Sequence, residues 1–303
     1  MRGSGATLRM WRADYANASL YNHSEGRHAI ALLGVNNVSI RGVTVRESGG
    51  DGVYVGTGHL RKTGAVCRDV QIVDATLTQN YRQGMSVIAV EGLVVENTVL
   101  SATDGTPPMA GVDFEPNDES HPLRGVRFTN VTASANRGRG FQFSLTRNSP
   151  ATPPLDIIFE RCAVEGGGSF GISLSGSGYG GIPSGGSLIF RNITVRDTEG
   201  SGLLVENKNG GATMVLENVA LTNVSTAGGA PIWLEGQTRD CLGVSFSGVE
   251  VWDDRARRPV KVLGNVSQMS GGITVHNAAL PPADCSFGTR PLPGVSMVCD
   301  PNA

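Results

Sequence analysis

"VRFTNVTA", residues 126–133, is the stretch that decides the fold. Two apolar residues alternate with a polar one, a polar pair follows, and a second apolar patch closes the segment. The pattern occurs eight more times, and successive copies start 23 to 33 residues apart. The other copies are "VSIRGVTV", "VQIVDATL", "LVVENTVL", "IIFERCAV", "LIFRNITV", "MVLENVAL", "VSFSGVEV" and "ITVHNAAL". Nine copies of one unit therefore cover nearly the whole chain.

A second short strand lies between consecutive copies and begins at a glycine. Examples are "DGVYV" (51–55), "AGVDFE" (110–115) and "RGFQFS" (139–144). A unit of about 30 residues with two or three short strands and no helical periodicity cannot bury its own apolar face, so neighbouring units must stack into a solenoid. The leucine-rich repeat pattern and a recurring Trp-Asp blade signature are both missing. We therefore predict an all-β solenoid of about nine coils.

The composition limits the classes of partner. The chain has 303 residues, 42 glycines and 15 prolines without a low-complexity block, which is typical of an ordered, turn-rich protein. The formal net charge is −2, and no basic stripe is present, so we expect no nucleic-acid partner. No apolar run approaches the roughly 20 residues of a membrane span, so we expect no membrane partner.

The pattern predicts one domain over residues 1–280 and an irregular tail over residues 281–303. Of the five cysteines, only Cys285 and Cys299, in the proline-rich tail, are plausible disulfide partners. The first residues begin as if in mid-strand and lack the apolar core of a signal peptide. We therefore expect that an upstream segment is missing from this chain.

With these repeats the chain resembles the right-handed parallel β-helix proteins of the pectin-lyase-like superfamily, over residues from about 5 to 280. The resemblance implies a right-handed parallel β-helix, a polysaccharide substrate along its groove and an extracellular location. Members of the superfamily include glycoside hydrolases, polysaccharide lyases, epimerases and viral tailspikes. The fold alone therefore does not choose between these activities.

The segment "AGVDFEPNDES", residues 110–120, places two carboxylates on one strand face. Neighbouring coils lie about 4.8 Å apart, so residues at one phase of the repeat form columns along the solenoid. Asp113 and Glu115 fall in outward columns, and Asp51 stands at a corner two coils earlier. We predict that these three carboxylates are catalytic and that Asp113 and Glu115 are exposed but inequivalent, one acid and one base. The alternative is a solvated acidic strand end.

Polar residues of adjacent coils surround these carboxylates in the predicted columns. Alternatively, Arg82 is a solvated turn residue and Arg139 is a salt-bridge partner of Glu115. His28 and His121 are weaker candidates for proton carriers. The predicted substrate-binding residues are Tyr54, Arg82, Gln83, Ser86, Arg139 and Gln142.

Three classes of function fit this pattern. The first is a glycoside hydrolase with carboxylate acid/base catalysis and no cofactor. The second is a lyase or epimerase on a uronate polymer, with Asp113 and Glu115 as Ca²⁺ ligands and Arg139 as base. The third is a non-catalytic, carbohydrate-binding or tailspike-like solenoid. "GGDGVYV" (49–55) is similar to one polygalacturonase motif, but Arg82 and Gln83 stand where that family has paired aspartates, so a polygalacturonase is not expected.

Asparagines recur at one phase of the repeat, directly after the first strand. Stacked amides can satisfy one another's donors and acceptors from coil to coil. We therefore predict that these asparagines are inaccessible and bonded to turn backbone, and that the glycosylation sequons at Asn130 and Asn192 are structural. The predicted buried column is Asn97, Asn130, Asn192 and Asn218.

Overall fold

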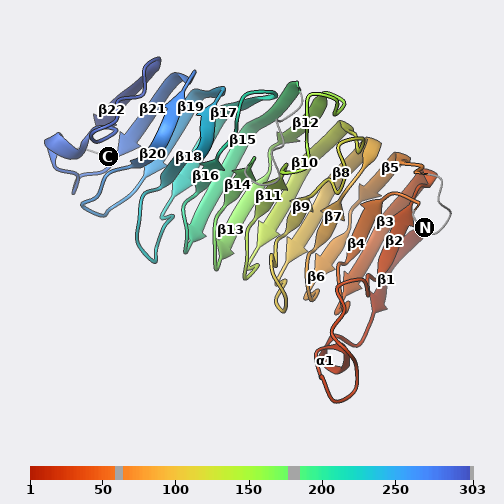
Figure 1. Cartoon of the computed structure of the whole chain (residues 1–303). Coiled ribbons are helices and arrows are strands. Elements are labelled where there is room, and N and C mark those ends of the chain that lie inside the picture. The colour runs from red at the N-terminus through yellow and green to blue at the C-terminus, as the bar shows by residue number, and fades with distance from the viewer. Residues whose placement is uncertain (59–63, 177–184, 301–303) are drawn as a thin grey trace.

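The computed structural model describes residues 1–58, 64–176 and 185–300. The chain winds into a parallel β-solenoid, with the N-terminus at one end and the C-terminus at the other (Figure 1). Within the described residues the helical elements are α1 (Arg12–Tyr15) and η2 (Pro282–Asp284). In that same part of the chain, no helix has the length and apolar character needed to cross a membrane.

Two sheets form the walls of the solenoid, and every strand pair described is parallel. The described part of the first sheet contains β1 (Arg2–Arg9), β3 (Asn36–Arg46), β5 (Cys67–Val73), β6 (Thr76–Thr78), β8 (Val90–Ser101), β10 (Leu123–Ser134), β12 (Leu155–Glu160), β13 (Ala163–Gly167), β15 (Gly186–Thr198), β17 (Thr213–Thr222), β19 (Val244–Trp252), β21 (Ser270–His276) and β22 (Val295–Asp300).

The second sheet consists of the short strands that lie between the copies of the first motif, and six of its described strands directly follow a glycine. Its nine strands in the described residues are β2 (Ile30–Leu33), β4 (Val53–Gly56), β7 (Met85–Val87), β9 (Val112–Phe114), β11 (Phe141–Ser144), β14 (Ile172–Ser175), β16 (Leu203–Glu206), β18 (Ile232–Leu242) and β20 (Val260–Ser267).

The register of the second sheet confirms the predicted columns. Ser86 pairs with Asp113 and Asp113 with Gln142, so these residues follow one another along the outer face. The residues on either side of Asp113, Val112 and Phe114, have no exposed surface. Alternation along each strand therefore directs apolar side chains inward and polar ones outward, as the sequence predicts.

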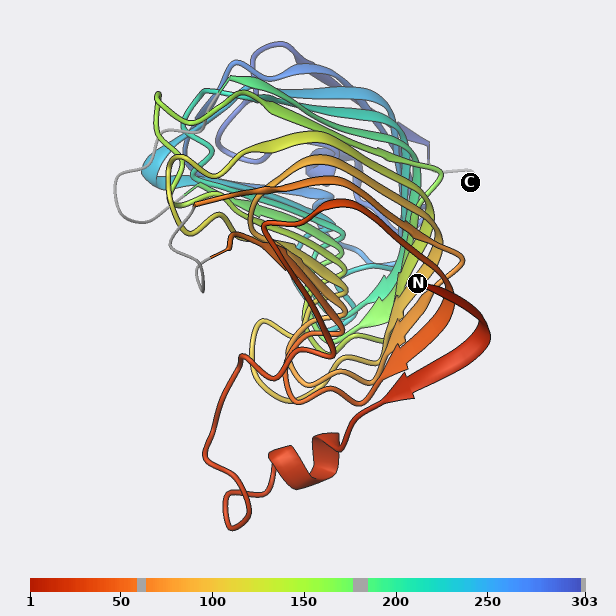
Figure 2. The same cartoon turned by 90° about the vertical axis from the view of Figure 1, so that its right-hand side faces the viewer.

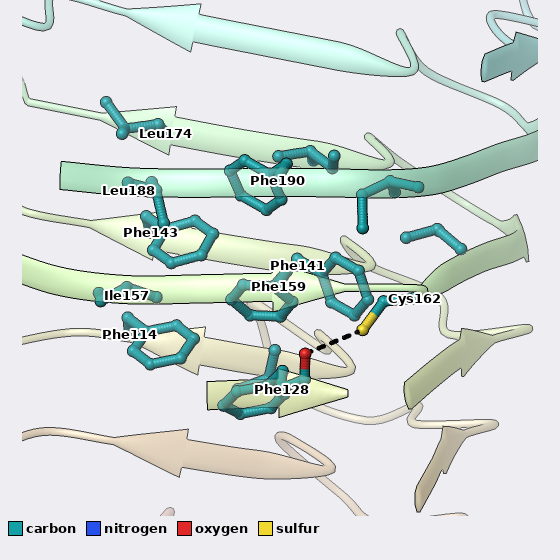
Figure 3. Packing of buried hydrophobic residues seen from close by; sticks show 14 of the residues in the cluster. Phe114, Phe128, Phe141, Phe143, Ile157, Phe159, Cys162, Leu174, Leu188 and Phe190 are labelled. Carbon is teal, nitrogen blue, oxygen red and sulfur yellow. Dashed lines mark hydrogen bonds between the residues drawn. The ribbon is translucent and has the colours of Figure 1, made fainter. Parts of the chain in front are cut away.

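Stacked phenylalanines fill the middle of the solenoid. The rings of Phe114 and Phe143 stack at 4.8 Å between centroids, and those of Phe128 and Phe159 at 4.5 Å. These rings come from opposite sheets and meet at the centre, where Phe190 joins them (Figure 3). The apolar contact between the two sheets gives the outer-face residues a rigid support.

The predicted burial of the asparagine column is wrong. Asn97, Asn130, Asn192 and Asn218 are all exposed. They adopt left-handed backbone angles, with φ between 49° and 55°, at a corner where the chain turns inside one long strand. Asparagine tolerates this conformation better than most residues, which explains its recurrence there. The side chains still form a ladder on the surface: Asn130 Nδ2 donates to Asn97 Oδ1 at 2.8 Å, and Asn218 Nδ2 to Asn192 Oδ1 at 3.1 Å.

The buried asparagines that bond to turn backbone lie a few residues further along the chain. Asn136 is 2% exposed; its Oδ1 accepts from the backbone N–H of Thr103 and its Nδ2 donates to the carbonyl of Leu100. Asn80 has no exposed surface, and its Oδ1 accepts from the backbone N–H of Ser48. The predicted interaction therefore exists at another corner of the coil.

The segment after residue 280, expected to be irregular, continues the first sheet. Strand β22 pairs in parallel with β21, and the predicted disulfide between Cys285 and Cys299 closes the loop before it. The bond ties the start of the segment to its last strand, which lets a stretch rich in proline add one more strand to the sheet. The free cysteines Cys67, Cys162 and Cys241 are buried.

An excursion of the chain, residues 10–28, leaves the first coil and carries α1. It projects from the solenoid and returns to β2 (Figures 1 and 2). Its path back runs against Gly49 and Gly50: a Cβ on Gly49 would lie 2.5 Å from the ring of Tyr15, and one on Gly50 would lie 2.3 Å from the carbonyl oxygen of Glu25. The two glycines therefore let the excursion approach the next coil closely.

Candidate functional site

A cleft of about 230 Å³ lies where the excursion meets the outer face of β4, β7 and β9. The strands supply outward residues of successive coils, and the excursion forms the opposite wall. The residues lining the cleft are Glu25, Gly26, His28, Tyr54, Arg82, Ile88, Glu115 and Asn117. Three predicted site residues, Tyr54, Arg82 and Glu115, are among them.

Arg82 connects the carboxylates of this region. Its Nε lies 3.1 Å from Glu25, its Nη2 lies 3.2 Å from Glu115, and its Nη1 lies 3.9 Å from Asp51. Burial acts to lower the pKa of Arg82, but the carboxylates of Asp51, Asp113 and Glu115 outweigh it, so the pKa is raised. The guanidinium therefore stays charged and holds Glu25 and Glu115 at the mouth of the cleft. Arg82 is not the solvated turn residue that the sequence also allowed.

Asp113 points outward as predicted, but it has no exposed surface, which corrects the expectation that it is accessible. Gln83 Nε2 donates to Asp113 Oδ2 at 3.0 Å, and Gln83 Oε1 accepts from the backbone N–H of Ala110. Long side chains on a coil only about 4.8 Å away can cover a short aspartate, and this was not visible in the column pattern. Burial, followed by the nearby charge of Glu115, raises the pKa of Asp113 well above its ordinary value.

Glu115 differs from Asp113 although it lies only two residues away. Its side chain is 37% exposed and forms an ion pair with Arg82, while Asp113 is enclosed. The two carboxylates are therefore inequivalent, with the accessible one ion-paired and the buried one biased toward its neutral form.

Asp51 is also buried, and its partner is His28 from the excursion. His28 Nδ1 lies 3.1 Å from Asp51 Oδ2 and accepts from the Asp51 backbone N–H at 3.2 Å. The imidazole stacks on the ring of Tyr54 at 4.5 Å. Burial, and then the charge of Asp51, raises the pKa of Tyr54, so its phenol stays protonated at neutral pH.

Several buried polar atoms here lack a hydrogen-bond partner among the described residues. They are both carboxylate oxygens of Asp51, Oδ1 of Asp113 and Oγ of Ser86. Buried polar groups are nearly always bonded to protein, water or a ligand, so a group of exceptions at one place indicates a functional region.

Four predicted substrate-binding residues do not line this cleft: Gln83 and Ser86 are buried, and Arg139 and Gln142 lie outside it. Arg139 and Gln142 line a neighbouring depression of about 180 Å³, where Arg139 Nη1 donates to Gln142 Oε1 and its guanidinium lies over the ring of Phe170. A larger depression, about 470 Å³, lies elsewhere, beside Glu91 and Arg124. Glu91 is paired with Arg68, whereas the buried, unpaired Asp51 contacts two residues of the cleft lining, His28 and Arg82, so we favour the cleft.

Sequence reasoning ranked His28 low and did not consider Glu25. Strand pairing aligns Ile30 with Val53, which places His28 directly before Asp51 in the corner column. Extending that column by one coil would have identified His28. Glu25 gave no such signal, because it belongs to the excursion and not to the repeat.

The described residues contain no group of three or more histidine, cysteine, aspartate or glutamate side chains arranged to hold a metal ion. Asp113 and Glu115 therefore do not form part of such a group in this arrangement.

Comparison with known proteins gives one match. A family model described as "Right handed beta helix region" matches residues 15–251. Searches of curated proteins and of solved structures found no match. The matched region includes every residue that lines the cleft.

Proposed function

Because the chain belongs to the right-handed β-helix family, which is consistent with the carbohydrate-associated pectin-lyase-like superfamily, we propose that it is a glycoside hydrolase acting in the cleft between the excursion and β9. The observation that carries this proposal is Glu115. It is an accessible carboxylate, ion-paired with Arg82, beside a buried carboxyl group whose pKa is raised. In hydrolysis, Glu115 accepts a proton from the attacking water.

The opposite wall supports this assignment. Glu25 and Glu115 bind different nitrogens of the same guanidinium, so their nearest oxygens lie at most about 9 Å apart. Carboxylates flank the scissile bond at about 5–5.5 Å in retaining glycosidases and about 6.5–9.5 Å in inverting ones. A sugar ring placed between these walls is within reach of acidic groups from both sides.

Asp113 takes a supporting role in this proposal. It has no surface through which it could touch a sugar, so it acts by holding Gln83 and by keeping its neutral form next to Glu115. A second negative charge at that place would repel the charge of Glu115. Asp51, also buried, acts through His28.

The charges of the cleft favour a neutral glycan over a uronate polymer. Glu25 and Glu115 line the opening, and the guanidinium of Arg82 is already shared by three carboxylates. A uronate carboxylate would therefore meet like charges without an unshared cation in the cleft wall. Arg139, the base in the lyase alternative, lies in the neighbouring depression.

We also propose that the protein acts outside the cell. The Cys285–Cys299 disulfide supports this location, since such bonds persist in oxidising compartments.

The test begins with incubation of the protein with a panel of neutral and acidic polysaccharides, with and without chelator. New reducing ends without ultraviolet absorbance from an unsaturated sugar indicate hydrolysis. Glu115→Gln should lower kcat by about 10²–10⁴-fold on the substrate so found. Glu235→Gln is the matched control, since Glu235 belongs to the same outward column at strand β18. Unsaturated products would favour the lyase, and binding without products would favour the adhesive solenoid.

A further inference from the structure

We infer that His28 is the proton donor of this site, with Asp51 as its positioning residue. The inference rests on the proposed hydrolase function and assigns the role that the buried Asp113 cannot fill. It draws on three features of His28: its contacts with Asp51, its stacking on Tyr54 and its place in the cleft wall.

His28 Nδ1 has two contacts, both with Asp51, and one of them is a hydrogen-bond donor while the other is an acceptor. The Asp51 backbone N–H donates to an unprotonated Nδ1, and Asp51 Oδ2, 3.1 Å away, accepts from a protonated one. Asp51 can therefore support either state of Nδ1. With Nδ1 protonated and held by Asp51 Oδ2, the ring can lose and regain the proton on Nε2 without rotation.

The carboxylate of Asp51 is the acceptor for a proton on Nδ1. It has no exposed surface, and neither oxygen receives a hydrogen bond from the described residues in the present arrangement. A buried carboxylate without a donor is costly, and the imidazolium N–H would supply one. The other charged or titratable groups around His28 are Arg82, Glu25, Glu115 and Tyr54.

The remaining nitrogen, Nε2, is the one available to a ligand. Nδ1 is taken by Asp51, the ring face is stacked on Tyr54, and the side chain is 16% exposed where it lines the cleft. Stacking and the Nδ1 contacts together fix the ring plane. Glu115 reaches the same cleft from β9, so a donor and an acceptor of protons face a common space.

The reaction balances with these two groups. The Nε2 proton of His28 moves to the glycosidic oxygen as the bond from that oxygen to the anomeric carbon breaks, and the bonding electron pair leaves with the departing hydroxyl. Water adds to the anomeric carbon and transfers a proton to Glu115. Glu115 then returns its proton to solvent, and His28 takes one up.

The experiment compares two kinds of substrate for the wild type, His28→Gln and Glu115→Gln. One is the polysaccharide found by screening, and the other is an aryl glycoside of the same sugar with a nitrophenol leaving group, which departs without protonation. We expect His28→Gln to lose about 10²–10⁴-fold in kcat on the polysaccharide and to keep most activity on the aryl glycoside. Glu115→Gln should lose activity on both. Equal losses of His28→Gln on both substrates, or no loss on the polysaccharide, would overturn the inference.

A second measurement does not depend on turnover. Nitrogen-15 NMR of the imidazole rings should show one histidine, assigned by its loss in His28→Gln, whose Nδ1 signal changes in Asp51→Asn. His23→Gln is the control, because it removes another histidine of the excursion. If the His28 signals are the same in Asp51→Asn and the wild type, Asp51 does not position His28. If the wild type cleaves no polysaccharide while the NMR result holds, the hydrolase proposal fails and the His28–Asp51 pair stands.

Discussion

Replacement of Asn136 by alanine should reveal how much one buried corner amide contributes to the solenoid. The change removes the acceptor of the Thr103 N–H, at 3.1 Å, and the donor to the Leu100 carbonyl, at 2.9 Å. Thr103 and Leu100 have no exposed surface, so water cannot replace the lost partner without rearrangement. An unsatisfied buried polar group costs about 1–3 kcal/mol, and two such groups with partial relaxation should lower the free energy of unfolding by about 2–4 kcal/mol.

The assay is urea unfolding followed by both circular dichroism and tryptophan fluorescence, so that a single transition can be verified. The matched control is Asn130→Gly. Asn130 is exposed, has φ of 53°, and donates to Asn97 on the surface. Glycine adopts that backbone conformation readily, so the control should change stability by less than about 0.5 kcal/mol. Equal effects of the two substitutions would refute the distinction between a buried and a surface amide ladder.

Two further predictions concern buried titratable groups. Since burial and Glu115 raise the pKa of Asp113, its contribution to stability is present below the ordinary aspartate pKa and is lost as pH rises through the folded value. Asp113→Asn should therefore match the wild type in thermal unfolding at pH 4 and exceed it at pH 8. Burial lowers the pKa of Lys208 to about 8, so the stability linked to it is complete above about 10.5 and lost as pH falls through about 8. Lys208→Met should lack the rise in unfolding midpoint that the wild type shows from pH 8 to pH 10; an identical pH dependence in both would contradict the assignment.

Because the motif repeats, most of the strand pairing and core burial could be predicted from the sequence. In every coil, Cβ direction alternates along a strand, so the pairing of Asp113 with Ser86 and Gln142 could be deduced from the spacing of glycines alone. The burial of Phe114 and Phe143 followed from the same alternation.

Exposure was harder to predict than direction. Asp113 points away from the core and is nevertheless enclosed, because Gln83 from the preceding coil reaches across it. Asn97 and Asn130 recur because of a left-handed backbone angle at the corner, and a recurrence of residue type does not distinguish that cause from burial. The exposure of these side chains thus depends on side-chain length and on backbone geometry at the corner, which the repeat period of the sequence does not reveal.

The excursion over residues 10–28 is not part of the repeat, so its position could not be predicted from the repeat pattern. Glu25 reaches Arg82 only because Gly50 lacks a side chain where the carbonyl of Glu25 passes. The sequence "SGGDG" shows glycines there, but it does not tell which distant segment will lie against them. The wall of the cleft that contains Glu25 therefore had to come from the structure.

The place of the cleft near one end of the described strands has a consequence for its dynamics. In a solenoid each coil is stabilised only by the coils on either side, so end coils fray more readily than central ones. In the part of the chain that the structure describes, β2 is the outermost strand of the second sheet, and it begins two residues after His28. A glycan that contacts the excursion, β4 and β9 together would stabilise the folded form of these coils. Amide hydrogen exchange in β2 should therefore slow when the glycan binds. Coils added or lost beyond β14 would leave that local equilibrium unchanged, so the length of the solenoid and the action of its cleft can vary independently.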